Sequence, residues 1–140
     1  MNTARKIGEV LGRAAVFAGM LCLVLTAGCK EEKEKLSLDG LPKDLRKIGE
    51  RLRDKDNNVR QEACIDLGHM GSSAVPAVPY LAEALHDSVI NVRLFAAMAL
   101  GDIGPEAKAA IPDLEWSVTH NEWKEVREAA QKALVRIRGE

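Results

Sequence analysis

The sequence predicts an all-α protein, an α-solenoid of about three helix pairs that follows a signal peptide and a charged tether. Three observations favour this fold class. Apolar positions recur every 33 to 34 residues from about residue 42 onward. Proline and glycine recur at fixed places between the apolar stretches. Hydrophobic residues make up 46% of the 140 residues but aromatic residues only 4%, and this composition favours helices rich in Ala and Leu over a β-sandwich.

Residues 1–28 have the pattern of a secretion signal. Three basic residues precede an uncharged apolar run of 12 residues, from Ala14 to Leu25. This run is shorter than the ~20 residues that a permanent membrane-spanning helix needs. We therefore expect a signal peptide, with an uncleaved anchor as the alternative.

The end of this segment adds a more specific feature. The residues Leu25-Thr26-Ala27-Gly28-Cys29 resemble the bacterial lipobox, although Thr26 stands where Leu is more usual. The resemblance implies cleavage before Cys29 and a lipid anchor on its thiol. Because Lys30 and not Asp follows Cys29, it also implies a place in the cell envelope, on the outer membrane facing the periplasm. An ordinary signal peptide with a chance cysteine is the alternative.

Residues 29–41 read as a solvated linker behind the lipidated cysteine. The run Lys30 to Lys35 alternates acidic and basic residues without an apolar period. Downstream, Cys64 is the one cysteine left in the mature domain, so we expect no internal disulfide and interpret Cys64 as a small buried hydrophobe.

The repeat domain spans residues 42–140, with units at about 42–74, 75–108 and 109–140. A Val-Arg pair recurs in each unit, and the residues 4, 8 and 11 positions after its valine are apolar, as one helix face requires. These stripes are Val59, Ala63, Leu67, Met70; Val92, Ala96, Leu100, Ile103; and Val126, Ala130, Leu134, Ile137. A second stripe upstream predicts the first helix of each pair. It comprises Leu45, Ile48, Leu52; Val78, Leu81, Leu85; and Ile111, Leu114, Val118.

Helix ends are marked by proline, glycine and a capping aspartate. Pro42, Pro79 and Pro112 stand where the first helices begin, and the first turn of a helix tolerates a missing N–H. Asp56 is placed to cap the second helix of unit one. Glycines close the second helices of the first two units, by this interpretation as the pairs Gly68 with Gly71 and Gly101 with Gly104.

The units resemble HEAT repeats, in the short bacterial form also found in phycocyanobilin lyases. The middle unit carries the likeness most fully, from Val92 to Ala107 and again at Ala110-Ile111-Pro112. The resemblance implies antiparallel helix pairs that hide their apolar faces by stacking, with the second helices on the concave side. It covers about residues 42–140 and is specific for architecture, not for activity.

One set of residues, a repeated arginine, could bind a ligand but also has a structural interpretation. Arg60, Arg93 and Arg127 recur with the repeat, either as an anion-binding ladder or, as we favour, as an internal ladder with Asp54 and Asp87. Asn121 stands at the matching place in unit three, where the ladder should weaken.

Catalysis, metals and cofactors find little support in the sequence. The three histidines, His69, His86 and His120, form no His-Glu pair, so we expect no metal site. No phosphate loop or nucleophile motif is present, and we predict no catalytic residue and no cofactor. The net charge of −1 also argues against a nucleic-acid partner.

The candidate partner-binding residues are Leu94, Met98, Trp116 and Trp123, because they change character between units. Leu94 and Met98 point away from the apolar stripe of the middle second helix and form either a docking groove or core between repeats. Trp116 matches Glu50 and Glu83 of the other units and is either an interface anchor or an end cap folded over its own core.

From these observations we expect a membrane-anchored scaffold or protein-interaction module and not an enzyme. A lyase-type enzyme subunit is the first alternative, favoured only by the family likeness. A structural spacer is the second.

Overall fold

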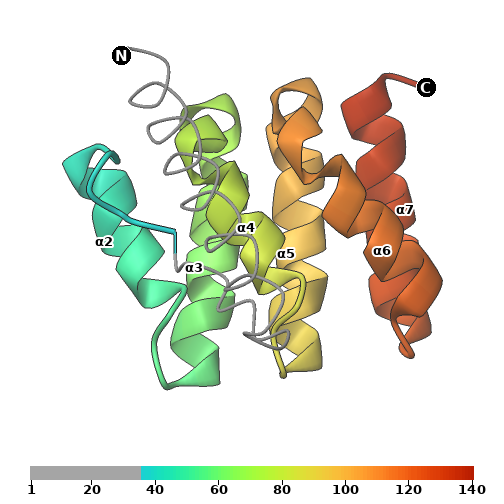
Figure 1. Ribbon diagram of the computed structural model, residues 1–140, viewed down its shortest axis with the longest axis horizontal. Coiled ribbons are helices and arrows are strands. Elements are labelled where there is room, and N and C mark those ends of the chain that lie inside the picture. The colour runs from blue at the N-terminus through green and yellow to red at the C-terminus, as the bar shows by residue number, and fades with distance from the viewer. Residues whose placement is uncertain (1–35) are drawn as a thin grey trace, which may run out of the picture. The chain divides into compact units, whose positions relative to one another are not determined.

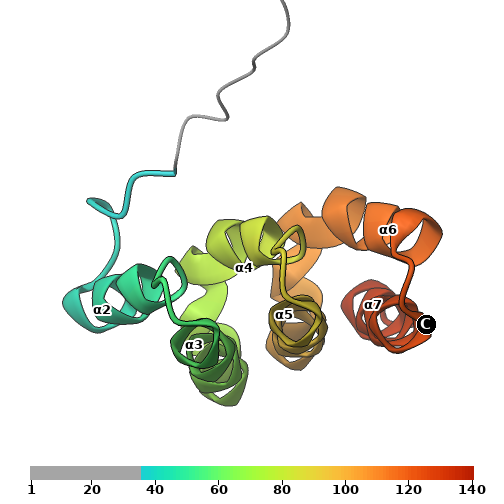
Figure 2. The same ribbon diagram turned by 90° about the horizontal axis from the view of Figure 1, so that it is seen from below.

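The computed structural model describes residues 36–140, and within them the expected all-α fold is confirmed. Six α-helices follow one another as three antiparallel pairs: α2 (Lys43–Arg51), α3 (Asn57–Met70), α4 (Val78–Ala84), α5 (Ile90–Ile103), α6 (Ile111–His120) and α7 (Lys124–Arg138). The helices α2, α4 and α6 form the first layer, and α3, α5 and α7 form the second layer (Figures 1 and 2). The residues predicted to form the signal peptide, together with Cys29 and most of the predicted linker, lie outside the described part of the chain.

The predicted apolar stripes form the core between the two layers. In the second and third units, all eight residues of the second-helix stripes are buried. In the first unit Ala63 and Leu67 are fully buried, while Val59 and Met70 at the ends of the stripe are half-buried. The stripe positions therefore hold the stack together, as burying one apolar face of each helix requires.

The helix starts follow the sequence signals. Pro42 is the N-cap of α2, and Pro79 and Pro112 each occupy the second position of α4 and α6. The Asp56 carboxylate accepts a hydrogen bond from the Asn58 backbone N–H at 2.9 Å, as a capping residue does.

Glycine ends α3 and α5 at one residue each. Gly71 and Gly104 are the C-caps and have positive φ angles of 53° and 80°, which residues with a Cβ rarely adopt. Each begins a 3₁₀ segment, η1 (Gly71–Ala77) or η2 (Gly104–Ala110), that leads to the next first-layer helix.

The interpretation of Gly68 and Gly101 as helix terminators is wrong, because both lie inside helices. A Cβ on Gly68 would stand 3.2 Å from the Cα of Ala99 in the next unit, and a Cβ on Gly101 would stand 3.2 Å from the Cα of Ala133. These glycines therefore let the second-layer helices approach closely. Gly68 and Gly101 recur with the same period as the true terminators, Gly71 and Gly104. The sequence pattern alone therefore does not separate the two kinds of glycine.

Candidate interaction surfaces

A groove runs between α5 and α7 on the second layer, and we call it the α5–α7 groove. It has a volume of about 640 Å³. Its lining combines apolar side chains with charged and polar ones, and comprises Leu94, Ala97, Met98, Gly101, Asp102, Glu125, Glu128, Ala129, Gln131, Lys132, Ala133, Val135 and Arg136. Two of the residues predicted to bind a partner, Leu94 and Met98, lie in it.

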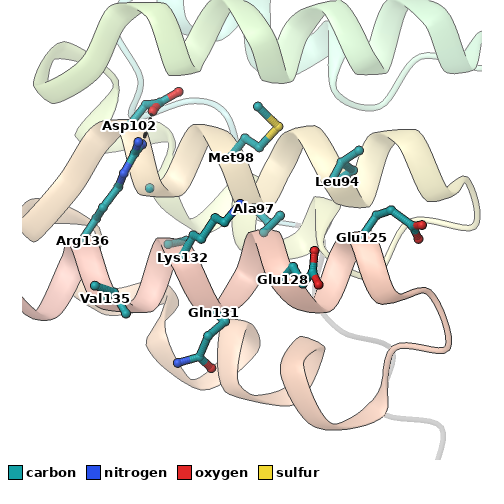
Figure 3. A pocket seen from close by; sticks show the side chains of 13 residues that line it. Leu94, Ala97, Met98, Asp102, Glu125, Glu128, Gln131, Lys132, Val135 and Arg136 are labelled. Atoms are coloured by element: carbon teal, nitrogen blue, oxygen red, sulfur yellow. Dashed lines mark hydrogen bonds and ion pairs between the residues drawn. The ribbon is translucent and has the colours of Figure 1, made fainter. Parts of the chain in front are cut away.

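The ends of the α5–α7 groove differ in charge. At one end Arg136 donates to Asp102 at 2.7 Å, an ion pair that joins the two helices (Figure 3). At the other end Glu125 and Glu128 stand on α7 (Figure 3). The Met98 side chain between them is 47% exposed, so an adaptable thioether is open to a partner.

The boundary between the first two units, called here the first repeat boundary, is closed by two ion pairs. Arg60 holds the Asp87 carboxylate through two bonds, Nε to Oδ2 at 2.8 Å and Nη2 to Oδ1 at 3.0 Å. Arg53 pairs with Glu83 at 2.9 Å. The hydrogen bond to Asp87 raises the pKa of the Arg60 guanidinium above its usual value, against the opposing effect of burial.

The arginine ladder is therefore real but pairs differently from the prediction. Asp54, six residues before Arg60, gives its backbone carbonyl to Arg60 Nη1 at 2.9 Å, whereas the carboxylate comes from the next unit. Arg93 and Arg127 repeat the carbonyl bond, to Asp87 and to Asn121, each at 2.8 Å. Counting six residues along one unit could not reveal a partner that stacking brings from the next unit.

The boundary between units two and three, the second repeat boundary, lacks both of those pairs. Asn121 takes the place of Asp87, and the Nε of Arg93 is buried without a hydrogen-bond partner. His86 and Trp116 take the places of Arg53 and Glu83, and their rings lie 4.7 Å apart. The His120 ring also stacks on Trp116, with the ring centroids 5.2 Å apart and the planes nearly parallel.

These residues line a second, smaller depression, which we call the edge hollow. It has a volume of about 280 Å³ and is lined by His86, Asp87, Arg93, Trp116, His120, Asn121 and Glu122. The sequence showed the substitution of Asn121, but not that Arg93 would line the same depression as Trp116 and two histidine rings. That arrangement depends on the stacking of two units and has no signal within either one.

The four predicted partner-binding residues occupy different places. Leu94 and Met98 line the α5–α7 groove, and Trp116, which is 42% exposed, lines the edge hollow. Trp123 is the N-cap residue of α7, is 47% exposed, and is among the lining residues of neither depression. Their role in binding stays a prediction.

Cys64 is fully buried on α3, with its Sγ 4.0 Å from the carbonyl oxygen of Val92 on α5. Burial raises the pKa of its thiol to about 12. This agrees with the interpretation of Cys64 as a core residue, since a buried protonated thiol is a poor nucleophile.

Residues 36–140 contain no candidate metal site and no candidate membrane-spanning helix. No group of three His, Cys, Asp or Glu side chains there is placed to hold a metal ion. None of the helices described is both long and apolar enough to cross a membrane. The absence of metal, cofactor and catalysis stays an expectation.

Comparison with known proteins places the repeats. The family model for HEAT repeats matches residues 45–135. Among solved structures, the chain is similar to an engineered protein determined by the Northeast Structural Genomics Consortium, with a TM-score of 0.58 and 28% sequence identity. That match covers 69% of this chain and 47% of the other, so the chain spans about half the length of the engineered protein. No curated protein matches the sequence.

Proposed function

The chain belongs to the family of HEAT-repeat proteins, and from this premise we propose that it is a noncatalytic protein-interaction module that binds its partner in the α5–α7 groove. The observation that carries the proposal is the groove itself. It exposes Met98 beside Leu94 and Val135 in a domain whose other large apolar side chains are mostly buried. Exposed apolar surface of this kind marks interfaces.

The groove suggests the chemistry of the partner segment. Its exposed Met98 and the neighbouring Leu94 suit one or two aliphatic or aromatic side chains. Glu125 suits a basic residue, because it makes no ion pair among the described residues, whereas Glu128 is paired with Lys124 at 3.3 Å and Asp102 with Arg136. We therefore propose an apolar peptide segment flanked by a basic residue as the occupant.

Site-specific photo-crosslinking tests this proposal. A photoreactive amino acid at position 98 should capture a partner in cells, whereas the same group at exposed Lys108 on η2 should not. Leu94→Glu should abolish capture from position 98 and leave the melting temperature nearly unchanged, since Leu94 is only half-buried. Equal capture from both positions would show that the groove has no special role.

The location of the protein in the cell is a separate part of the proposal. We propose that a lipid on Cys29 holds the domain at the cell envelope of a bacterium, on the outer membrane and facing the periplasm. The sequence of the segment Leu25 to Cys29, followed by Lys30, supports this proposal. Several acyl chains on one cysteine would hold the protein firmly, at ~0.8 kcal/mol for each buried methylene. Cys29→Ser should release the protein from membranes and remove labelling by a palmitate analogue. Equal labelling of the variant and the wild type would contradict the lipid anchor.

A further inference from the structure

We propose that the edge hollow binds a carboxylate group of a partner peptide, with Arg93 as the main donor and Trp116 as the wall against which the peptide packs. The proposal deepens the proposed function by adding a second contact of defined chemistry, and it rests on that function only in taking a peptide as the source of the carboxylate. It begins from a difference between two positions that are otherwise equivalent, Asp87 and Asn121.

The Asp87 carboxylate makes two kinds of hydrogen bond at the first repeat boundary, one to a backbone N–H and one to Arg60. Its Oδ1 accepts a hydrogen bond from the Val89 backbone N–H at 2.8 Å, which shapes the turn before α5. Both carboxylate oxygens also accept from Arg60. The side chains of this pair are only 13% and 14% exposed, so the bonds are well shielded from water.

The Asn121 side chain makes the equivalent bond to a backbone N–H but makes no bond to Arg93. Its Oδ1 accepts from the Trp123 backbone N–H at 3.4 Å, in the same kind of turn. The other terminal atom of an asparagine is Nδ2, which is a donor and cannot accept from a guanidinium. The edge of Arg93 that matches the carboxylate-binding edge of Arg60 therefore has no acceptor within the described chain, and its Nε is buried and unpaired.

The chemical group that fits this place is a carboxylate from outside the domain. Two donors, Arg93 and the Asn121 amide, border the same hollow, and a carboxylate can accept from both. Two acidic residues also line the hollow. Asp87 does not supply the acceptor, because its oxygens are already held by Arg60 and Val89, and the exposed Glu122 side chain makes no hydrogen bond to Arg93. Arg93 is also fixed in place, since its Nη1 donates to the Asp87 carbonyl at 2.8 Å.

The hollow also offers aromatic surface beside the guanidinium of Arg93. Trp116 packs against both His86 and His120, and His86 is itself held by Asp113 at 2.8 Å. The equivalent place at the first repeat boundary is closed by the Arg53–Glu83 pair. At the second repeat boundary a partly exposed indole stands there instead, and it offers apolar surface to the residues that flank a bound carboxylate.

The test is a titration of the intact, ¹⁵N-labelled chain with short peptides, followed through the Arg Nε–H and Trp Nε1–H signals. The probes are Ac-Ala-Ala-Glu-Ala-Ala-NH₂, Ac-Ala-Ala-Ala with a free C-terminal carboxylate, and Ac-Ala-Ala-Gln-Ala-Ala-NH₂, at constant ionic strength. We expect saturable shifts of the Arg93 and Trp116 signals with at least one of the two carboxylate peptides and none with the glutamine peptide. The first two probes distinguish an acidic side chain from a chain terminus as the source.

Arg60 is an internal control, because its equivalent edge is occupied by Asp87 and its signal should not move. Asn121→Asp supplies the missing acceptor within the chain. It should weaken binding by about tenfold or more, and it should raise the melting temperature, so lost binding cannot be attributed to misfolding. Arg93→Gln is the second variant and should abolish the shift of Trp116.

Three results would overturn the proposal. These are no saturable shift with either carboxylate, as when an ordered water satisfies Arg93; equal shifts of Arg60 and Arg93; or unchanged affinity in Asn121→Asp. Crosslinking from position 98 in the α5–α7 groove is measured in the same chain without substitutions in the edge hollow. Specific crosslinking without carboxylate binding in the edge hollow would reject this inference alone, whereas carboxylate binding without specific crosslinking would reject the groove.

Discussion

The two repeat boundaries use the same positions of the helix pair but are held together differently. At the first, Arg60 meets a carboxylate and Arg53 meets Glu83. At the second, Arg93 faces an asparagine and His86 packs on Trp116. The second-layer helices nevertheless approach equally closely at the two boundaries, because a Cβ on either Gly68 or Gly101 would stand 3.2 Å from the Cα of the facing alanine. Apolar packing is thus conserved between the boundaries, while polar pairing is where they differ.

The largest effect should come from breaking the packing that both boundaries share. Leu100 is fully buried in α5, the helix that lies between α3 and α7. Leu100→Asp places an unpaired charge there and should cost about 4 kcal/mol or more. Far-UV circular dichroism should show loss of cooperative unfolding, because α5 contributes to both boundaries. A melting curve like that of the wild type would disprove the assigned helix register.

A smaller effect should separate the two boundaries. Arg60→Met and Arg93→Met each remove donors to backbone carbonyls of the preceding turn, but only Arg60→Met also leaves a shielded carboxylate, Asp87, without its partner. We expect a loss of about 2–3 kcal/mol for Arg60→Met and about 1 kcal/mol for Arg93→Met, measured by urea unfolding. Equal losses would mean that the Arg60–Asp87 pair adds nothing to the first boundary.

This comparison shows what the sequence could and could not predict. The stripes from Val92 to Ile103 and from Val126 to Ile137 were predictable, because burial of one helix face imposes a period that a single chain displays. The partner of Arg60 was not, because Asp87 comes from the next unit and the sequence offers Asp54 at a shorter separation. The same holds for the edge hollow, whose Arg93 and Trp116 lie on different units.

The α5–α7 groove was half predictable. The change from Gln61 and Ile65 to Leu94 and Met98 indicated an apolar place on the middle second helix. Whether it is groove or core depends on how the facing helix packs. There α7 presents Glu128, Lys132 and Val135, which leave Met98 open. A periodicity argument fixes which face a residue takes, but not how far the neighbouring side chains cover it.

A gain of stability is expected beyond the second boundary. The Ser117 side chain on α6 is fully buried, and its hydroxyl has no hydrogen-bond partner among the described residues. The matching position of unit two is Ala84. Ser117→Ala should therefore stabilise the protein by about 1 kcal/mol, since it removes a buried polar group without changing the packing. Thermal unfolding measures this, and a destabilised variant would show that the hydroxyl has a partner.

The smallest effect concerns how often each boundary opens, and thiol labelling can measure it. Cys64 lies at the first repeat boundary, and Ala97 is the matching, fully buried position at the second. In a chain with Cys22 and Cys29 replaced by serine, a thiol reagent at pH 8 should react slowly with Cys64, because burial raises its pKa to about 12 and the boundary must open first. In a Cys64→Ala background, the thiol introduced by Ala97→Cys should react about three- to tenfold faster, because Arg93 at the second boundary lacks the shielded carboxylate that Arg60 has at the first, and the Arg136–Asp102 pair that crosses the second boundary is exposed. Ala97 also lines the α5–α7 groove, so the effect of Asn121→Asp on its labelling separates boundary opening from access through the groove. Reaction rates in the unfolded chains correct for intrinsic reactivity.

Adding Asn121→Asp should then slow labelling at position 97, since it restores the acceptor for Arg93. If labelling at position 97 is as slow as at Cys64, and Asn121→Asp leaves it unchanged, the two boundaries are equally closed and the difference in pairing has no consequence for their opening.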